Sequence, residues 1–370
     1  MGKAVKISEF SGSSPPEIFV GRWNYPNVYT GILAPQEHGN TEQMSSAEIW
    51  QKNKLPIQNI LQMRNQLIYG RTQSNIHKPL TDKKFLPTMQ EVAMTHKSVG
   101  TEFKLKKPVS HNPEKESRVP LISNAAPIEK VRLEENAPVK KKIDYLVQDK
   151  EVKSAPALIE LHKSGIPNSS LIKVLSAGLL GLGKNRKLVP TRWSITAVDD
   201  TISKDLLKKI KTYKEIPEFQ VFSANYVGNH YHFLLLPDKW SFEVIEIALK
   251  SKGVWKDYES FFPRKKYADS VTGAYYANRL ALTEYLEKIK RQCSCLVIRE
   301  IRPEYSSPLG VGILRQTSRE AFSLQGKKFS TLKEALNYIQ ENLKQPITNY
   351  TVKSKLLTEY GKQSRLSRFF

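Results

Sequence analysis

The sequence predicts an α+β protein: a mostly antiparallel, mixed sheet with flanking helices, an extended segment rich in proline and lysine, and a flexible C-terminal tail. Helical and strand patterns follow one another irregularly, without the regular strand–helix–strand repeat of a parallel sheet. Residues 221–226 and 231–236 flank Gly228-Asn229, which predicts a β-hairpin. Residues 275–289 place apolar side chains at helical spacing and predict a long amphipathic helix.

The first part of the chain, residues 1–103, is expected to form an N-terminal domain. Residues 17–31 have the pattern of strand and turn. Ser45 and Glu48 have the spacing of a helix-capping box, and residues 57–68 repeat apolar side chains at helical spacing.

Residues 104–156 change character. They contain six prolines, no glycine, and twelve basic against eight acidic side chains. Because such a composition cannot bury much apolar surface by itself, this segment is expected to be a linker or an extended arm that wraps another domain.

A C-terminal α+β domain is expected over residues 157–350, followed by a flexible tail at 351–370. Ser203, Ser241 and Thr331 each precede an apolar run and are expected to cap helices. Helices are expected at 158–165, 171–180, 203–210, 241–249 and 332–343, and strands at 192–198, 296–301 and 311–314.

Composition narrows the classes of partner. The chain has 370 residues and a net charge of +22, which favours a polyanion such as nucleic acid. The sequence holds no apolar run of membrane-spanning length, and no membrane partner is expected. Cys293 and Cys295 are too close along one strand for an ordinary disulfide, so buried thiols in an intracellular, cytoplasmic protein are expected. Neither a metal nor a cofactor is expected.

A glycine-rich segment at residues 178–185 nearly matches the sequence motif of a phosphate-binding loop. Asn185 stands where that motif needs the serine or threonine that holds magnesium, so a helix end followed by a basic loop is preferred. Four basic residues follow in nine positions without an acid: Lys184, Arg186, Lys187 and Arg192. They are candidate DNA-backbone contacts, the alternative being an ordinary solvated loop.

An arginine–tryptophan pair occurs twice, at Arg22-Trp23 and at Arg192-Trp193. Arginine stacked on tryptophan can hold a base or a sugar, although a core tryptophan beside a surface arginine fits equally well. The candidate contacts to a nucleotide or base are Arg22, Trp23, Trp193, Tyr275 and Tyr276.

Two further polar patterns fit either a structural or a functional role. His230 and His232 share a strand face, where sheet packing is preferred over the beginning of a metal site. Four arginines are interleaved with glutamates, which fits either a charged cleft for DNA or a network of ion pairs: Arg299, Arg302, Arg315 and Arg319. No nucleophile–base pair is recognisable, and the catalytic residues, if any, are unknown.

The tail ends in a short motif. Gln363, Leu366, Phe369 and Phe370 follow the pattern by which replication and repair proteins bind the sliding clamp PCNA. One tight helical turn would place Leu366 and the two phenylalanines on one side, where they can fill an apolar pocket. Basic residues flank the motif, as expected of an extended arm.

Four longer segments are distinctive: residues 20–31, 188–198, 273–286 and 309–320. They resemble the archaeal DNA-repair protein family NreA. The resemblance implies a role in tolerating DNA damage, with PCNA bound through Gln363, Leu366, Phe369 and Phe370, and hence a nucleoid-associated protein. Some relatives carry an N-terminal cluster of cysteines that binds zinc. This chain has no cysteine there, so no metal is carried over.

The leading hypothesis is therefore a DNA repair factor that PCNA recruits and whose basic loops contact DNA. The alternative is a DNA-modifying or nucleotide-using enzyme with a site between the two domains. A third hypothesis is an adaptor that binds the clamp and has no DNA affinity of its own.

Overall fold

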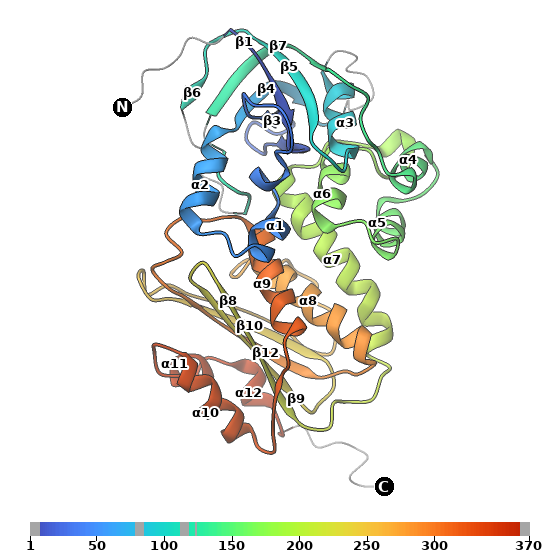
Figure 1. The fold of residues 1–370 in the computed structure, drawn as a ribbon. Helices are drawn as coiled ribbons and strands as arrows, with labels where there is room; N and C mark the ends of the chain where they lie inside the picture. The colour runs from blue at the N-terminus through green and yellow to red at the C-terminus, as the bar shows by residue number, and fades with distance from the viewer. Residues whose placement is uncertain (1–7, 78–84, 112–117, 123, 363–370) are drawn as a thin grey trace. The chain divides into compact units, whose positions relative to one another are not determined.

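The computed structural model describes residues 8–77, 85–111, 118–122 and 124–362 (Figure 1). It forms two compact units, here called the first unit (1–202 with 308–313) and the second unit (203–307 with 314–370). The chain passes between them three times: within helix α7 (Thr191–Ile210), between residues 307 and 308, and within helix α9 (Val311–Ser323). Each unit combines helices with a mixed sheet, which confirms the predicted α+β class. No helix among the described residues is long and apolar enough to cross a membrane.

The first unit is built on a sheet with the strand order β1-β5-β7-β4-β3-β2, and β6 pairs with β7. Only β4 and β7 pair in parallel among the strands described in this unit. The strands are β1 (Glu9–Ser14), β2 (Glu17–Val20), β3 (Asn27–Ala34), β4 (Ile68–Asn75), β5 (Val99–Leu105), β6 (Ser110–His111) and β7 (Asn124–Leu133).

Helices surround this sheet, and a buried ion pair joins two of its parts. The helices are α1 (Ala47–Lys52), α2 (Ile57–Gln66), α3 (Leu86–Met94), α4 (Lys141–Gln148), α5 (Ser154–Lys163), α6 (Asn168–Ser176) and the start of α7. Arg64 of α2 is fully buried, and its guanidinium contacts the carboxylate of Glu17 in β2 through both terminal nitrogens. Arg64 Nε also donates to the Leu121 carbonyl at 3.0 Å.

The second unit has a sheet with the strand order β11-β10-β12-β9-β8-β13, in which β10 and β12 are parallel. The strands are β8 (Phe219–Tyr226), β9 (Asn229–Leu236), β10 (Ser241–Ala248), β11 (Val254–Glu259), β12 (Ser294–Ile301) and β13 (Lys327–Phe329). The helices are α8 (Gly273–Ile289), α9, α10 (Leu332–Asn342), α11 (Thr348–Thr351) and α12 (Lys355–Glu359).

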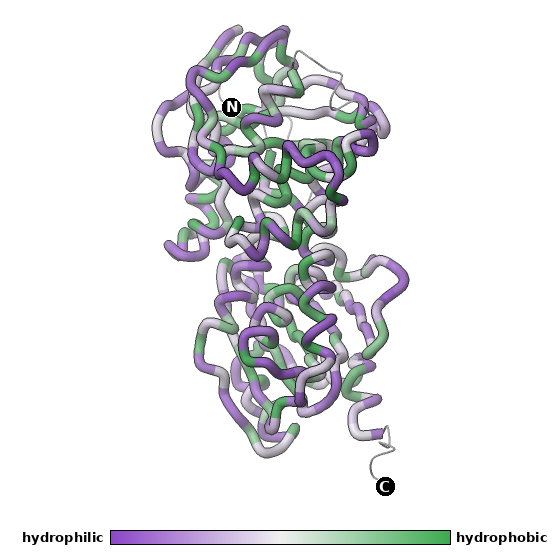
Figure 2. Tube along the Cα trace, turned by 90° about the vertical axis from the view of Figure 1, so that its right-hand side faces the viewer, coloured by the Kyte–Doolittle hydropathy of each residue, from purple (hydrophilic) through white to green (hydrophobic). Residues whose placement is uncertain are grey.

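Both faces of this second sheet are covered. One face packs on α8 and α9, where the ring centroids of Phe242 and Tyr275 lie 5.1 Å apart and those of Phe233 and Phe322 lie 4.7 Å apart. The other face forms one apolar cluster with α10, α11 and α12. In Figure 2 the hydrophobic residues of each unit gather toward its interior, while hydrophilic residues predominate in its peripheral loops.

The described residues among 104–156 belong to the first unit. Within them, β7 lies between β5 and β4 in the sheet, and α4 and the start of α5 follow. Strand β7 buries Ile128 and Val131 while Glu129, Lys130 and Arg132 face solvent. The average composition of residues 104–156 conceals this short alternation of buried and exposed side chains. The expected boundaries at 103/104 and 156/157 therefore differ from those of the compact units.

Several local predictions are confirmed. The hairpin of β8 and β9 turns at Gly228, which has a φ of 81°. Helix α10 carries the complete capping box of Thr331 and Glu334. Helices α2, α5, α6 and α8 and strand β12 lie where they were expected.

Other local predictions are wrong. Residues 192–198 and 311–314 were expected to be strands but begin α7 and α9. In α7 the buried residues Ile195, Val198 and Ile202 follow helical spacing, which a seven-residue window cannot distinguish from alternation.

Residues 241–249 were expected to be a helix, but residues 241–248 form β10. This strand lies between β11 and β12 and is buried on both faces, so its sequence lacks the usual alternation. The cap of α1 is Ser46 rather than Ser45, and the Ser45 hydroxyl donates to Glu17 instead.

The end of the described chain is fixed to the second sheet by a buried carboxylate. Glu243 of β10 is 1% exposed and accepts hydrogen bonds from Ser354 Oγ at 2.6 Å, Lys355 N at 3.0 Å and Leu356 N at 2.9 Å. It thereby satisfies backbone N–H groups at the start of α12, which otherwise would lack partners.

We expect Glu243→Gln to lower the free energy of unfolding by roughly 1–3 kcal/mol, because an amide nitrogen then faces buried donors. Amide hydrogen exchange at Lys355 and Leu356 should accelerate together with this loss. The control is Glu341→Gln on the exposed side of α10, which should change the free energy by less than about 0.5 kcal/mol. Unchanged exchange in the Glu243 variant would contradict the anchoring role.

Candidate nucleic-acid interface

A tight turn between β2 and β3 displays the first arginine–tryptophan pair. Gly21 N donates to the Tyr29 carbonyl at 2.8 Å, and Asn27 N donates to the Asn24 carbonyl at 2.8 Å. Asn24 has a φ of 62°, a conformation that asparagine tolerates better than most residues. The turn leaves Trp23 63% exposed, with the guanidinium carbon of Arg22 4.1 Å from its ring centroid.

The second pair reaches the same turn from helix α7. Thr191 Oγ1 at the start of α7 accepts a hydrogen bond of 2.9 Å from Val20 N. Two residues later, Trp193 is 44% exposed, and its ring centroid lies 5.7 Å from that of the exposed Tyr25. Two segments about 170 positions apart therefore meet at one surface through Tyr25, a contact that their sequences do not reveal.

The exposed surface continues onto β3 and β4. The guanidinium carbon of Arg71 lies 4.2 Å from the ring centroid of Tyr29, which is partly exposed and follows the turn directly. We call this set the aromatic–arginine surface: Arg22, Trp23, Tyr25, Tyr29, Arg71 and Trp193. Aromatic faces and guanidinium planes of this kind are the groups on which unpaired bases stack.

The predicted basic loop lies at the same end of the sheet. Asn27 pairs with Asn75 in the register of β3 and β4, and just beyond, Leu188 N donates to the Ile76 carbonyl at 2.9 Å. Lys184 and Lys187 are exposed in this loop. Arg192 is partly exposed as the second residue of α7.

Arg186 has a different role from its neighbours. Its buried guanidinium donates to the carbonyls of Gly181, Val147 and Asp149 at 2.9, 2.7 and 2.6 Å. Burial lowers the pKa of this guanidinium, while the nearby Asp149 raises it. Arg186 therefore fixes the loop to the segment after α4, and we withdraw it from the candidate DNA contacts.

The glycines before this loop serve the fold. Gly178 has a φ of 70° just after α6, and a Cβ there would lie 2.9 Å from the Lys187 carbonyl. Leu179 N donates to the Val174 carbonyl at 3.2 Å, as at many helix C-termini. This geometry agrees with a helix end rather than with a phosphate-binding loop.

Tyr275 and Tyr276 do not join the aromatic–arginine surface. Both are buried in the second unit, and Tyr276 Oη accepts a hydrogen bond of 2.9 Å from Ala268 N. Burial raises the pKa of the Tyr275 hydroxyl well above its ordinary value. These two tyrosines are core residues.

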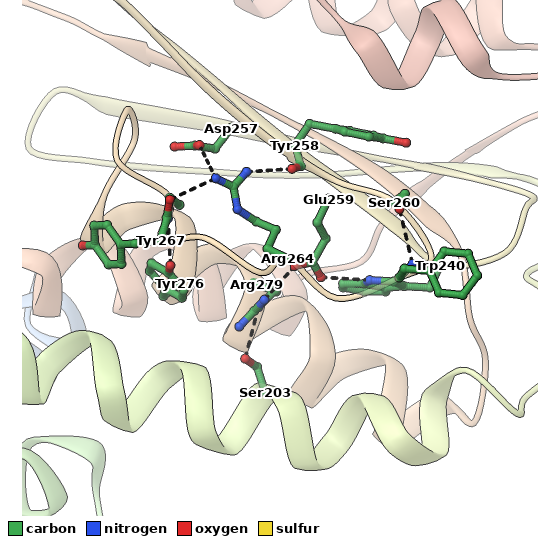
Figure 3. A network of polar contacts seen from close by, with 12 residues as sticks. Ser203, Trp240, Asp257, Tyr258, Glu259, Ser260, Arg264, Tyr267, Tyr276 and Arg279 are labelled. Atoms are coloured by element: carbon green, nitrogen blue, oxygen red, sulfur yellow. Dashed lines mark hydrogen bonds and ion pairs between the residues drawn. The ribbon is translucent and has the colours of Figure 1, made fainter.

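Sequence reasoning missed a polar network that lies close to them (Figure 3). Glu259 at the end of β11 accepts hydrogen bonds from Trp240 Nε1 at 3.0 Å and from Arg279 Nη1 at 2.8 Å. Arg279 Nε reaches Ser203 Oγ at 3.2 Å. Four separate segments of the chain contribute these groups, so no local pattern could have identified the network.

The remaining charged and sulfur-containing candidates are structural. Arg299 pairs with Glu246 at 2.8 Å, Arg302 with Glu300 at 2.7 Å, and Arg319 with Glu284 at 2.6 Å. Cys293 and Cys295 are buried free thiols, as expected, and burial raises the pKa of both. Within the described parts of the chain, no group of three His, Cys, Asp or Glu side chains could hold a metal ion.

His232 packs inside the second sheet, as expected. Its Nδ1 lies 2.8 Å from Ser223 Oγ, while its Nε2 is buried without a hydrogen-bond partner among the described residues. Burial, with smaller contributions from His230 and Arg302, lowers the pKa of His232 from 6.5 to about 4. In the folded protein, His232 is therefore neutral at pH 7.

Gln363, Leu366, Phe369 and Phe370 lie outside the described residues. The tail that carries them continues directly from Lys362, three positions beyond the end of α12. Its attachment point is thus the helix that Glu243 anchors.

Two family models together match almost the whole chain. The family model described as "Archaeal Nre, N-terminal" matches residues 2–256, and "Archaeal Nre, C-terminal" matches residues 259–369. The boundary between these models falls inside β11 and so within the second unit. No solved structure matches the chain.

Curated relatives cover almost the whole chain. "DNA repair protein NreB" of Archaeoglobus fulgidus is 33% identical over 97% of this chain and 91% of its own length. "DNA repair protein NreA" of the same organism is 33% identical, over 90% of this chain and 85% of its own length. "DNA repair protein NreA" of Haloferax volcanii is 31% identical over 99% and 90%.

We expect the protein to lose stability in acid partly through His232. Its folded-state pKa lies below the unfolded value, so its contribution is present above about pH 6.5 and is lost as the pH falls toward 4. Between pH 7 and pH 4, urea unfolding of the wild type should lose about 3 kcal/mol more than that of His232→Gln. The exposed His77→Gln is the matched control and should follow the wild type; identical losses in all three proteins would refute the assignment.

Proposed function

The chain belongs to the archaeal Nre family, and we propose that it is a DNA repair factor that the sliding clamp PCNA recruits to DNA. In this proposal the C-terminal motif binds the clamp, and the aromatic–arginine surface with its basic loop contacts the DNA. The observation that carries the DNA contact is the meeting of two distant arginine–tryptophan segments at one exposed surface.

The clamp-binding proposal rests on the tail sequence. Leu366 and the pair Phe369 and Phe370 supply apolar anchors, and Gln363 supplies an amide that can form hydrogen bonds. Buried aromatic side chains commonly contribute most of the binding energy of such an interface. Because the anchors follow soon after α12, the clamp would hold the folded protein within a short distance of DNA.

In the DNA-binding proposal, basic residues contact phosphates and aromatic residues contact bases. Lys184, Lys187 and Arg192 carry charge for phosphates, which positions nucleic acid without reading its sequence. Trp23 and Trp193 supply exposed rings on which bases can stack. Such a surface suits unpaired bases better than the closed stack of an intact duplex.

An enzyme with a nucleotide pocket is not favoured by a specific observation. Tyr275 and Tyr276, two of the residues that motivated it, are buried in the core of the second unit.

We expect full-length protein to bind PCNA from the same source with a Kd in the micromolar range or below, and Phe369→Ala/Phe370→Ala to abolish detectable binding. The reason is that both aromatic anchors of the motif are removed, which leaves only Leu366 as an apolar anchor. Isothermal titration calorimetry measures both proteins. Ser364→Ala/Ser367→Ala, at spacer positions of the same tail, should retain wild-type affinity; a wild type that does not bind would refute the proposal.

We expect Trp23→Ala and Trp193→Ala each to weaken binding to single-stranded DNA by roughly 5- to 150-fold, since one stacked base contributes about 1–3 kcal/mol. Fluorescence anisotropy with a labelled oligonucleotide measures this loss. The matched control is Tyr145→Ala, because Tyr145 is 62% exposed in the same unit but lies outside the aromatic–arginine surface.

The basic loop is tested by the salt dependence of the same binding. Lys184→Ala/Lys187→Ala should reduce the slope of log K against log salt by about 1.4, because each phosphate that a lysine no longer neutralises lowers the slope by roughly 0.7. Wild-type affinity that does not change with salt would rule out the basic-loop account.

A further inference from the structure

The loop between β11 and α8 displays an apolar tip. Within it, Phe262 is 76% exposed, and the ring of the adjacent Phe261 is partly exposed and meets it edge to face. Pro263 follows directly. A phenylalanine this exposed contributes little to the core of the second unit, so its presence calls for another explanation.

Contacts of Arg264 hold the loop against β11 (Figure 3). Arg264 Nη1 donates to the Tyr258 carbonyl at 2.7 Å, and its Nη2 donates to the Tyr267 carbonyl at 3.1 Å. The same Nη2 lies 3.0 Å from Asp257 Oδ1. The guanidinium of Arg264 thereby joins the middle of the loop, at residues 264 and 267, to β11.

A second set of contacts fixes the return of the loop to α8. Asp257 Oδ2 accepts a hydrogen bond of 2.7 Å from Val271 N, and Tyr276 Oη accepts one of 2.9 Å from Ala268 N. The backbone on either side of the tip is thus ordered before any ligand binds. Preorganisation of this kind lowers the entropic cost of binding.

The surroundings of the tip are basic. Lys265 and Lys266 are exposed beside it, and Lys211 Nζ lies 5.0 Å from the Phe261 ring centroid. No acidic residue occurs from position 260 to position 268. An apolar side chain flanked by lysines is complementary to nucleic acid, because the ring can contact a base while the lysines contact the neighbouring phosphates.

We propose that this loop is a second nucleic-acid contact, in which Phe262 inserts against an unstacked base at an opened duplex while Lys265 and Lys266 hold the flanking phosphates. This inference rests on the proposed function as a DNA-contacting repair factor. It adds a preferred substrate class: DNA with a fork or junction, where a base step is already partly unstacked and a wedge costs less to insert.

The test compares Phe262→Ala with Val352→Ala. Both wild-type side chains are 76% exposed and belong to the second unit, so the control removes a similarly exposed apolar group away from the loop. Anisotropy measures binding to a forked duplex and to the same duplex fully paired, and 2-aminopurine at the fork reports unstacking. Thermal unfolding checks that both variants remain folded.

We expect Phe262→Ala to bind the forked DNA about 5- to 20-fold more weakly and to lose the 2-aminopurine signal, while its binding to paired duplex changes less than about twofold. Val352→Ala should behave as the wild type in every assay. Lys265→Glu/Lys266→Glu should weaken binding to both DNAs, because it reverses charges at the phosphates.

Two results would overturn the inference in distinguishable ways. Undiminished fork binding by Phe262→Ala, alongside weakened binding by Trp23→Ala, would reject the wedge and leave the proposed function intact. Absence of DNA binding by the wild type would reject both. Phe262-dependent binding to anionic phospholipid vesicles without fork binding would assign the tip to a membrane surface instead and so also reject the wedge.

Discussion

The buried carboxylate of Glu259 is the constraint on which the second unit depends most. It is bound by Arg279 from α8 and by Trp240 from the segment before β10, and Arg279 in turn reaches Ser203 in α7. Removing either Glu259 or Arg279 would leave the other charge buried without its partner, which typically costs about 3–5 kcal/mol. The same network holds the end of β11, the strand from which the loop carrying Phe262 departs. The stability of the unit and the presentation of this loop therefore have a common physical origin.

Buried arginines explain why the net charge alone does not identify the functional surface. Arg64, Arg186, Arg279 and Arg299 are buried and donate to carboxylates or other protein oxygens within their own units. Arginine suits this role because its planar guanidinium offers several donors in a fixed geometry. The charge available to a polyanion lies instead on exposed lysines such as Lys184 and Lys187. A count of basic residues treats both classes alike, which is why Arg186 was grouped with its neighbours.

Much of the fold could be predicted where the signals are local. The glycine turn between β8 and β9 and the capping box of α10 depend on residues within a few positions of one another. Strand β10 was missed because it is buried on both faces, and β7 because a charged, proline-rich segment surrounds it. Of the candidate interface, Trp23 and Trp193 were recognised as candidates, but Tyr25 was not. The contact that joins them depends on the placement of α7 against β2, which no local pattern encodes.

Weak surfaces become sufficient when the protein is tethered. An exposed tryptophan or phenylalanine with a few lysines gives modest affinity, because stacking is shared with solvent and the charge is screened by salt. In the proposed function, a clamp-bound tail would change this balance, because it would convert DNA binding into an intramolecular event at high effective concentration. Tight binding by the surfaces themselves would even be a disadvantage, since it would retain the protein on undamaged DNA away from the clamp. Under the proposed recruitment, the tail would determine where the protein acts, and the folded units would need only to distinguish opened DNA from paired DNA.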